Sequence, residues 1–214
     1  SIILVYTSIN ICGNLVLYFF RFDVGNEGAY SIFAAVAFAA QVLVMMVIPL
    51  LRKKFSKSCL FISGFIIQIV GFAVILIMAF AKLYTPQSWY ILCMPGILIY
   101  LGYGMLNVIM TIFLSDSVDY GEVMNGTRDE SVIFSMQTFT VKLASGVAVF
   151  LAGLIVDWIH LDTSATVQTQ DTLDALRMWM TIPSVILLIV GIFVFKRFYK
   201  LDDARMEEIK SKLN

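Results

Sequence analysis

Long apolar runs separated by short polar segments dominate this sequence. Six of them, approximately residues 1–20, 30–51, 58–81, 90–114, 131–156 and 178–195, contain almost no charge. Each is long enough to cross roughly 30 Å of hydrocarbon as a helix that rises about 1.5 Å per residue. The pattern predicts an all-α, polytopic membrane protein, with six transmembrane helices forming one domain over residues 1–195.

The segment that follows the last run, residues 196–214, has a different pattern. Met206, Ile209 and Leu213 recur at helical spacing after an aspartate that can cap a helix. These positions predict a short amphipathic tail, which we expect to lie on the cytoplasmic face.

Composition agrees with a lipid bilayer as the surroundings of this chain. Hydrophobic residues make up 60% of it and charged residues 14%, against about 45–50% and about 25% in soluble domains. No basic patch or motif supports nucleic-acid binding. The spans lack paired carboxylates, a zinc-binding histidine pair and a Ser/His arrangement, so we expect no enzyme, no metal site and no organic cofactor.

Positive charge is distributed unequally between alternate loops. Eleven Lys and Arg residues lie in the loop 52–57, at Arg128 and in the tail, against three on the other side, Arg21, Lys82 and Arg177. Because Lys and Arg are retained on the cytoplasmic side, we expect both ends of the chain to be cytoplasmic. The expected location is a plasma membrane, specifically a bacterial inner membrane.

Lys142 is the one charged residue inside an apolar run, and an ionisable side chain there indicates a functional site. It lies eleven residues after Ser131, hence roughly 16 Å into the membrane. With Ser131, Ser135, Thr138 and Ser145 it forms one polar stripe on the helix. We interpret Lys142 as part of a polar pathway, or as a lysine that pairs with a carboxylate outside this segment.

The first run repeats such a stripe with Thr7, Asn10, Asn14 and Tyr18. Two readings stay open for it: pathway lining, or hydrogen-bonding contacts between helices. In the fourth run we expect the glycines, at positions 96, 102 and 104, to serve close helix packing. The acidic segment from Asp116 to Glu130 is expected to be a cytoplasmic loop with turns at Gly121 and Gly126.

Three stretches in succession resemble a known signature. They are Ser115-Asp-Ser-Val-Asp-Tyr-Gly-Glu122, Thr127-Arg-Asp-Glu-Ser131 and Phe134-Ser-Met-Gln-Thr-Phe-Thr-Val-Lys142. Together with Tyr18-Phe-Phe-Arg-Phe22 and the segment 172–183, they resemble the glycoside-pentoside-hexuronide:cation symporters, the melibiose-carrier-like branch of the major facilitator superfamily. The resemblance covers most of the chain.

This resemblance implies the second, C-terminal six-helix half of a twelve-span transporter, with a missing N-terminal half as its partner. The implied function is symport of a sugar or glycoside with Na⁺ or H⁺ by alternating access, the cation being bound mainly by the missing half. Gln137, Thr138, Val141 and Lys142 would line the sugar and cation region. Asn107 aligns with a sugar-stacking tryptophan of the melibiose-carrier branch, so the aromatic platform would be lost there. Asp116, Asp119 and Arg128 would form a cytoplasmic gate.

An alternative is a half-size protein of six spans that dimerises as a transporter or channel. Both readings share the lipid bilayer as partner. They differ in whether further spans belong to the same polypeptide.

Overall fold

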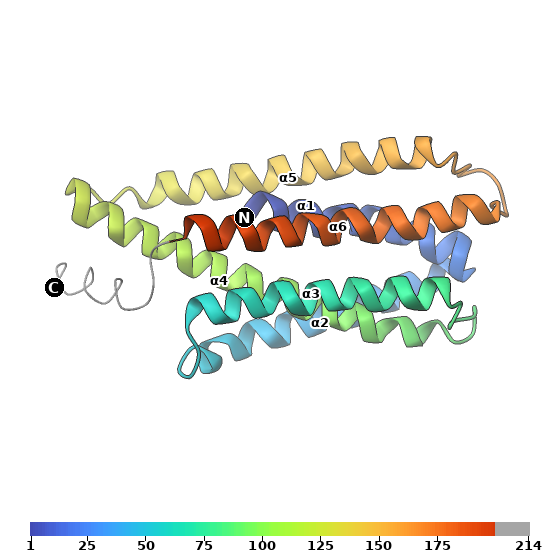
Figure 1. Cartoon of the computed structure of the whole chain (residues 1–214), viewed down its shortest axis with the longest axis horizontal. Helices are drawn as coiled ribbons and strands as arrows, with labels where there is room; N and C mark the ends of the chain where they lie inside the picture. The colour runs from blue at the N-terminus through green and yellow to red at the C-terminus, as the bar shows by residue number, and fades with distance from the viewer. Residues whose placement is uncertain (200–214) are drawn as a thin grey trace.

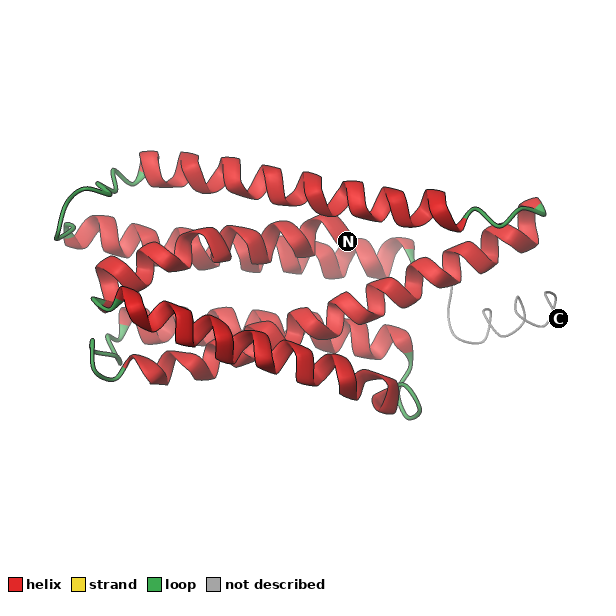
Figure 2. Cartoon of the chain, turned by 180° about the vertical axis from the view of Figure 1, so that it is seen from behind, coloured by secondary structure: helices red, strands yellow, loops and turns green. Residues whose placement is uncertain are grey.

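Six long helices lie side by side in this computed structural model, which describes residues 1–199 (Figures 1 and 2). They are α1 (Ile2–Tyr18), α2 (Glu27–Leu51), α3 (Lys57–Phe80), α4 (Cys93–Asn125), α5 (Glu130–Trp158) and α6 (Gln170–Phe198). A π-helical segment, η1 (Phe19–Val24), continues α1, and a short 3-10 helix, η2 (Trp89–Leu92), precedes α4. Six helices of this part of the chain are long and apolar enough to cross a membrane. The predicted all-α, six-span fold is confirmed.

Helices α4 and α6 extend well beyond the apolar runs. The fourth run ends near residue 114, but α4 continues to Asn125, and α6 begins eight residues before the sixth run, at Gln170 rather than near 178. The expected loop from Asp116 is therefore wrong: Asp116 and Asp119 lie on α4. Hydropathy marks the part of a helix in hydrocarbon, whereas its backbone hydrogen bonds continue into the polar flank.

Local signals decide where these helices begin and end. Gly126 ends α4 with a left-handed backbone, φ 73°, which glycine adopts without steric cost. Gly121, the other expected turn, lies inside the helix. Helix α6 starts after Thr169, whose side-chain oxygen accepts a hydrogen bond of 3.2 Å from the Thr172 backbone N–H. The structure describes the tail only as far as residue 199; helix α6 reaches Phe198, past the predicted boundary at 195, and the remaining tail residues lie outside the described part.

The helices form two groups of three. Helix α1 packs against α5 and α6, whereas α4 packs against α2 and α3, and α3 meets α6 between the groups. The first helix of each three-helix unit, α1 or α4, thus packs against the second and third helices of the other unit. Nested three-helix repeats of this kind are a feature of major facilitator halves.

Glycines allow the closest helix contacts. A Cβ on Gly102 would lie 2.6 Å from the backbone oxygen of Gly64 on α3, and one on Gly104 would lie 2.6 Å from the Val44 side chain on α2. A Cβ on Gly96 would lie 2.4 Å from the Phe33 ring. The expected packing role of these glycines is confirmed.

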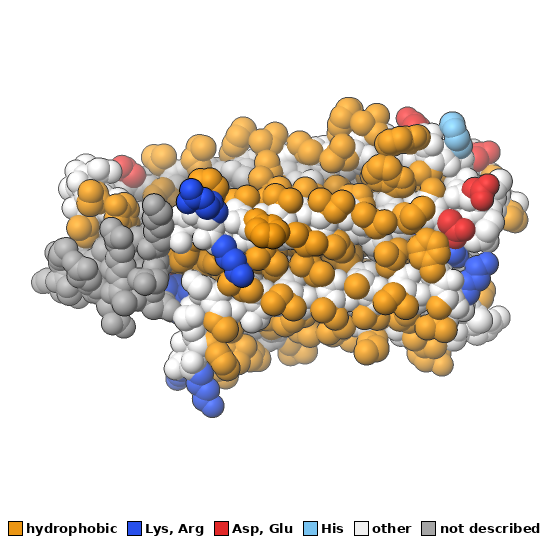
Figure 3. All heavy atoms as spheres, in the orientation of Figure 1, with side chains coloured by type: hydrophobic (Ala, Val, Ile, Leu, Met, Phe, Trp, Pro, Cys, Tyr) orange, Lys and Arg blue, Asp and Glu red, His pale blue; other side chains and the backbone are white. Residues whose placement is uncertain are grey.

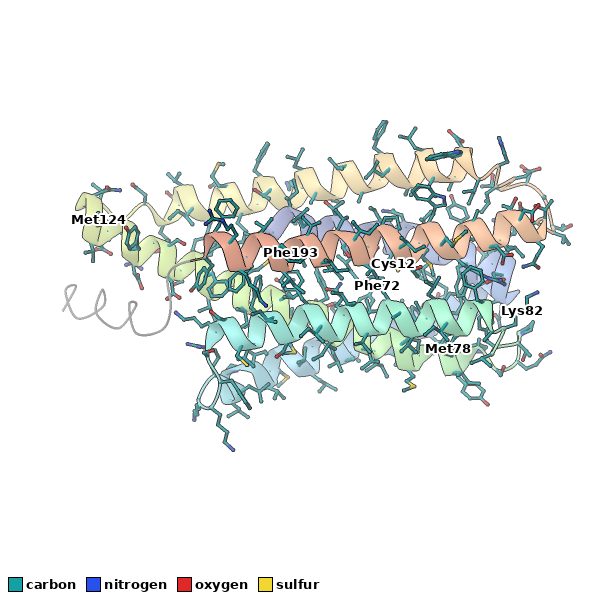
Figure 4. The ribbon with its side chains drawn as sticks, in the orientation of Figure 1. Cys12, Phe72, Met78, Lys82, Met124 and Phe193 are labelled. Carbon is teal, nitrogen blue, oxygen red and sulfur yellow. The ribbon has the colours of Figure 1, made fainter. Side chains whose placement is uncertain are left out.

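The two ends of the bundle differ in charge and connectivity. Met124 and Lys82 mark opposite ends (Figure 4). The α2–α3 and α4–α5 connections share the Met124 end, and the other three connections share the Lys82 end (Figure 1). Between the ends, the face shown in Figure 3 is covered by hydrophobic side chains. This band is what a bilayer-spanning bundle presents to lipid.

Candidate functional site

A polar hollow of about 230 Å³ lies between α1 and α4. Helix α1 lines it with Ile9, Asn10, Gly13 and Asn14, and helix α4 with Tyr100 and Tyr103. Two amides and two phenols therefore border one space near the middle of two membrane-spanning helices. Gly13 has no neighbouring atom within 4 Å of where a Cβ would be, which keeps this wall open.

The two asparagines bond only to their own helix. Asn10 Nδ2 donates to the Tyr6 carbonyl oxygen at 2.6 Å, and Asn14 Nδ2 donates to the Asn10 carbonyl oxygen at 2.7 Å. Within residues 1–199 neither side chain bonds to another helix. Each amide oxygen is left as an acceptor beside the hollow. This geometry favours lining over inter-helix bonding for Asn10 and Asn14, and their part in transport stays a prediction.

Asn107 belongs to the wall just beyond this hollow. The Tyr6 hydroxyl donates to Asn107 Oδ1 at 3.2 Å, and the Tyr6 and Tyr103 rings meet edge to face with centroids 5.8 Å apart. Tyr100 was not among the residues expected from the sequence. Its signal was present, since Tyr100, Tyr103 and Asn107 recur at steps of three and four on one helix face.

Tyr18, the last residue of the α1 stripe, lies apart from this hollow. Its ring stacks on Phe22 with centroids 6.5 Å apart, at the π-helical end of the span. It is not among the residues that line the hollow.

The polar stripe of α5 is open in the described half. Helix α5 packs on α1 through buried alanines, among them Ala144 and Ala148. Lys142 lies two residues before Ala144, hence about 160° away around the helix. Thr138 and Lys142 are exposed, whereas Gln137 and Val141 are half-buried.

None of these four α5 residues lines the hollow between α1 and α4. Within residues 1–199, Lys142 and Gln137 have no side-chain hydrogen bond or ion pair. Thr138 bonds its own helix, at Phe134, over 3.0 Å. The structure therefore gives two separate polar surfaces, one on α5 and one between α1 and α4.

Lys142, the one charged residue inside an apolar run, is exposed in the described half, whereas two cations outside the runs, Lys57 and Arg177, are buried. Lys57, at the start of α3, forms an ion pair with Asp116 of α4, and each side chain is only 4% exposed. Tertiary packing, not apolar sequence, buries this pair.

The three expected gate residues fall into two groups. Asp116 pairs with Lys57 inside the bundle, while Asp119 accepts from exposed Arg128 at 3.2 Å. Arg128 also donates to Glu122 at 2.7 Å, and this hydrogen bond raises the pKa of its guanidinium. The described residues thus contain a buried ion pair and a surface ion-pair network at the Met124 end.

A buried charge cluster at the Lys82 end was not predicted from the sequence. Arg177 of α6 donates two hydrogen bonds to the carboxylate of Asp23 in η1, one from Nε at 2.9 Å and one from Nη2. Both side chains are 3% exposed. Arg177 also donates to Asp174 at 2.6 Å, and the Tyr84 hydroxyl donates to Asp23. Burial, aided by the Asp23 hydrogen bond, raises the pKa of the Tyr84 phenol, so the phenol stays protonated as a donor.

Comparison with known proteins agrees with this architecture. The chain is 25% identical over 205 residues to an uncharacterized symporter of Bacillus subtilis, covering 96% of this chain and 43% of that protein. It is 25% identical to the raffinose carrier protein of Pediococcus pentosaceus, covering 96% and 31%. It is 26% identical to the isoprimeverose transporter of Lactiplantibacillus pentosus, covering 88% and 38%. The chain thus spans less than half the length of these relatives.

The family model described as "MFS/sugar transport protein" matches residues 1–203. Six membrane-spanning helices, the paired groups of three and this match over nearly the whole chain lead to one assignment. The chain is a multi-pass membrane segment that belongs to the MFS/sugar transport protein family.

Proposed function

We propose that the whole protein carries a sugar or glycoside across the membrane together with a cation, by alternating access. This chain forms one six-helix half, and a second, N-terminal half covers the face that bears Lys142. The observation that carries the proposal is the hollow of two amides and two tyrosines between α1 and α4 in a chain of this family. The names of its relatives, a raffinose carrier and an isoprimeverose transporter, support this substrate class.

The chemistry of the hollow suits a sugar. Hydroxyl groups both donate and accept hydrogen bonds, and the amides of Asn10 and Asn14 and the phenols of Tyr100 and Tyr103 offer matching groups. The tyrosine rings also offer apolar faces for the C–H faces of a sugar ring. These rings supply an aromatic wall in the region where Asn107 replaces the expected tryptophan.

We propose that Lys142 couples sugar binding to cation binding. Its ammonium group can donate three hydrogen bonds and has no partner in the described half. A carboxylate of the other half would bind it in one state and release it in another. Coupling of this kind is reciprocal, so cation binding raises sugar affinity by the factor by which sugar raises cation affinity.

The location follows from the same proposal. The α2–α3 connection, with Arg52, and the α4–α5 connection, with Arg128, share one end of the bundle. Because Lys and Arg are retained on the cytoplasmic side, we propose that this end is cytoplasmic. Both ends of this segment then lie on the cytoplasmic side of a bacterial inner membrane. The coupling ion, Na⁺ or H⁺, is bound mainly by groups of the N-terminal half.

Two variants of the full-length protein test the proposal. Lys142→Leu is expected to abolish the dependence of sugar uptake on the cation, while Lys54→Leu, an exposed lysine in a loop, leaves it unchanged. Asn10→Ala is expected to weaken sugar binding about fivefold, the effect of one neutral hydrogen bond. Wild-type coupling in Lys142→Leu would refute the role of Lys142, and unchanged sugar affinity in Asn10→Ala would refute the hollow as the sugar site.

A further inference from the structure

A second concave surface lies between α5 and α6, with α1 behind it. It has a volume of about 570 Å³ and shares no residue with the polar hollow. Helix α1 packs against both α5 and α6, and Figure 1 shows it behind them. The lining is apolar throughout: Ile11 of α1, Leu151 of α5, and Met178, Trp179, Ile182, Pro183, Ile186 and Leu187 of α6. We call this surface the α5–α6 groove.

The α5–α6 groove begins at the Lys82 end of the bundle and continues into the apolar part of α6. The rings of Trp158, at the end of α5, and Trp179 lie with centroids 5.1 Å apart. Trp158 is 69% exposed. Tryptophan at the ends of spans occupies the headgroup level of a bilayer. The Trp pair therefore places the mouth of the groove among headgroups and its length beside acyl chains.

Charge around this mouth is mainly acidic, although Lys82 donates to Gln170 beside Asp171 at 3.2 Å. Between Lys142 and Arg177 the chain carries four aspartates, at positions 157, 162, 171 and 174, and no Lys, Arg or Glu. Acidic side chains gather with the single histidine at this end in Figure 3. Arg177 pairs with Asp23 and Asp174, whereas Asp157 and Asp171 have no ion pair within residues 1–199. Asp157 adjoins Trp158, and Asp171 lies in the first turn of α6.

We propose that the α5–α6 groove holds a phospholipid with a primary ammonium headgroup, of the phosphatidylethanolamine class. One acyl chain occupies the apolar groove, and the ammonium group donates charge-assisted hydrogen bonds to Asp157 and Asp171. A phosphatidylglycerol headgroup would bring net negative charge to the same aspartates. A phosphatidylcholine headgroup carries no N–H donor. The aspartates thus select the lipid by its headgroup, and the apolar groove binds its acyl chain.

The full-length protein in nanodiscs tests this site. Phosphatidylethanolamine, phosphatidylcholine and phosphatidylglycerol with identical acyl chains, brominated at mid-chain, are added in turn at equal mole fraction. The quenching assigned to Trp179 is the difference between wild type and Trp179→Phe. Brominated phosphatidylethanolamine is expected to reach half-maximal quenching at about fivefold lower mole fraction than brominated phosphatidylglycerol.

Two variants separate the parts of the site. In the double variant Asp157→Asn with Asp171→Asn, all three lipids are still expected to quench Trp179. The ratio of the mole fractions for half-maximal quenching by phosphatidylglycerol and phosphatidylethanolamine is expected to fall from about five to about one. Leu151→Phe with Ile186→Phe fills the groove and is expected to remove quenching by all three lipids. Ile77→Phe, on an exposed part of α3, is the matched control and leaves quenching unchanged. Equal quenching by the three headgroups in wild type, or quenching that survives the filled groove, would show ordinary boundary lipid and overturn the proposal. These readouts do not depend on sugar transport.

Discussion

The buried cluster around Arg177 and Asp23 is expected to be the strongest single electrostatic contribution to the stability of this half. It joins η1, the α3–α4 connection and α6 through one carboxylate and one guanidinium, both 3% exposed. Replacing Arg177 with Met keeps the volume of the side chain and removes the charge. Asp23 would then remain buried as a carboxylate with only the Tyr84 hydroxyl as a donor.

The magnitude follows from the difference between breaking and replacing a buried pair. Leaving one charge uncompensated costs about 3–5 kcal/mol, whereas replacing both partners with apolar residues is often neutral. Arg177→Met should therefore lower the melting temperature by roughly 10 °C, taking about 2–4 °C per kcal/mol for a domain of this size. Asp23→Leu should cost less, because Arg177 keeps its 2.6 Å bond to Asp174. The double variant should recover most of the loss.

The measurement is thermal unfolding of the purified full-length protein in one detergent, for both single variants and the double variant. The control is Arg21→Met, which breaks an exposed ion pair to Glu27 at 3.8 Å and is expected to cost less than about 1 kcal/mol. Additive losses in the double variant would show that the two residues do not act as a pair. An Arg177→Met protein as stable as wild type would refute the buried-charge argument altogether.

Three further predictions concern packing and gating. Gly102→Ala should destabilise the protein by about 1–3 kcal/mol, because the new Cβ would meet the α3 backbone, whereas Gly146→Ala, with no atom within 4 Å, should leave the melting temperature unchanged or raise it. Gln68→Met should raise the melting temperature, because both side-chain polar atoms of Gln68 are buried without a partner and such groups cost about 1–3 kcal/mol; a lower melting temperature would contradict this account. Arg128→Gln, which removes the ion pair to Asp119, should slow sugar turnover more than it weakens equilibrium sugar binding, as flux and binding assays on one preparation can decide; equal losses would argue against a gate.

The sequence predicts the spans well because membrane helices obey one dominant constraint. Every backbone polar group must be satisfied inside hydrocarbon, so a long apolar run becomes a helix whatever its tertiary partners are. Helix ends are less predictable, as α4 shows. Its last residues, from Ser115 to Asn125, are mostly polar and lie outside the apolar run, yet the helix continues until Gly126.

Side-chain partners were predictable only where one helix face contains them. The α1 stripe led to Asn10 and Asn14, because residues three or four apart share a helix face. The pair of Asp23 and Arg177 joins residues 154 positions apart in the chain. No local spacing relates them, and only the packing of α6 against η1 brings them together. Lys57 and Asp116, 59 positions apart, pair for the same reason.

We predict that the open polar face of helix α5 borders a pathway and not lipid. Its exposed surface has two parts: one carries Thr138 and Lys142, and the other carries large apolar side chains such as Phe139, Leu143 and Phe150. A lysine facing the centre of a bilayer costs about 2.5–3.5 kcal/mol on insertion scales. Rotating α5 so that Lys142 faces water or a polar partner, with the apolar part toward lipid, avoids that cost. No described residue supplies such a partner for Lys142. The cost of exposing this lysine to lipid therefore favours a second half that covers this face of α5.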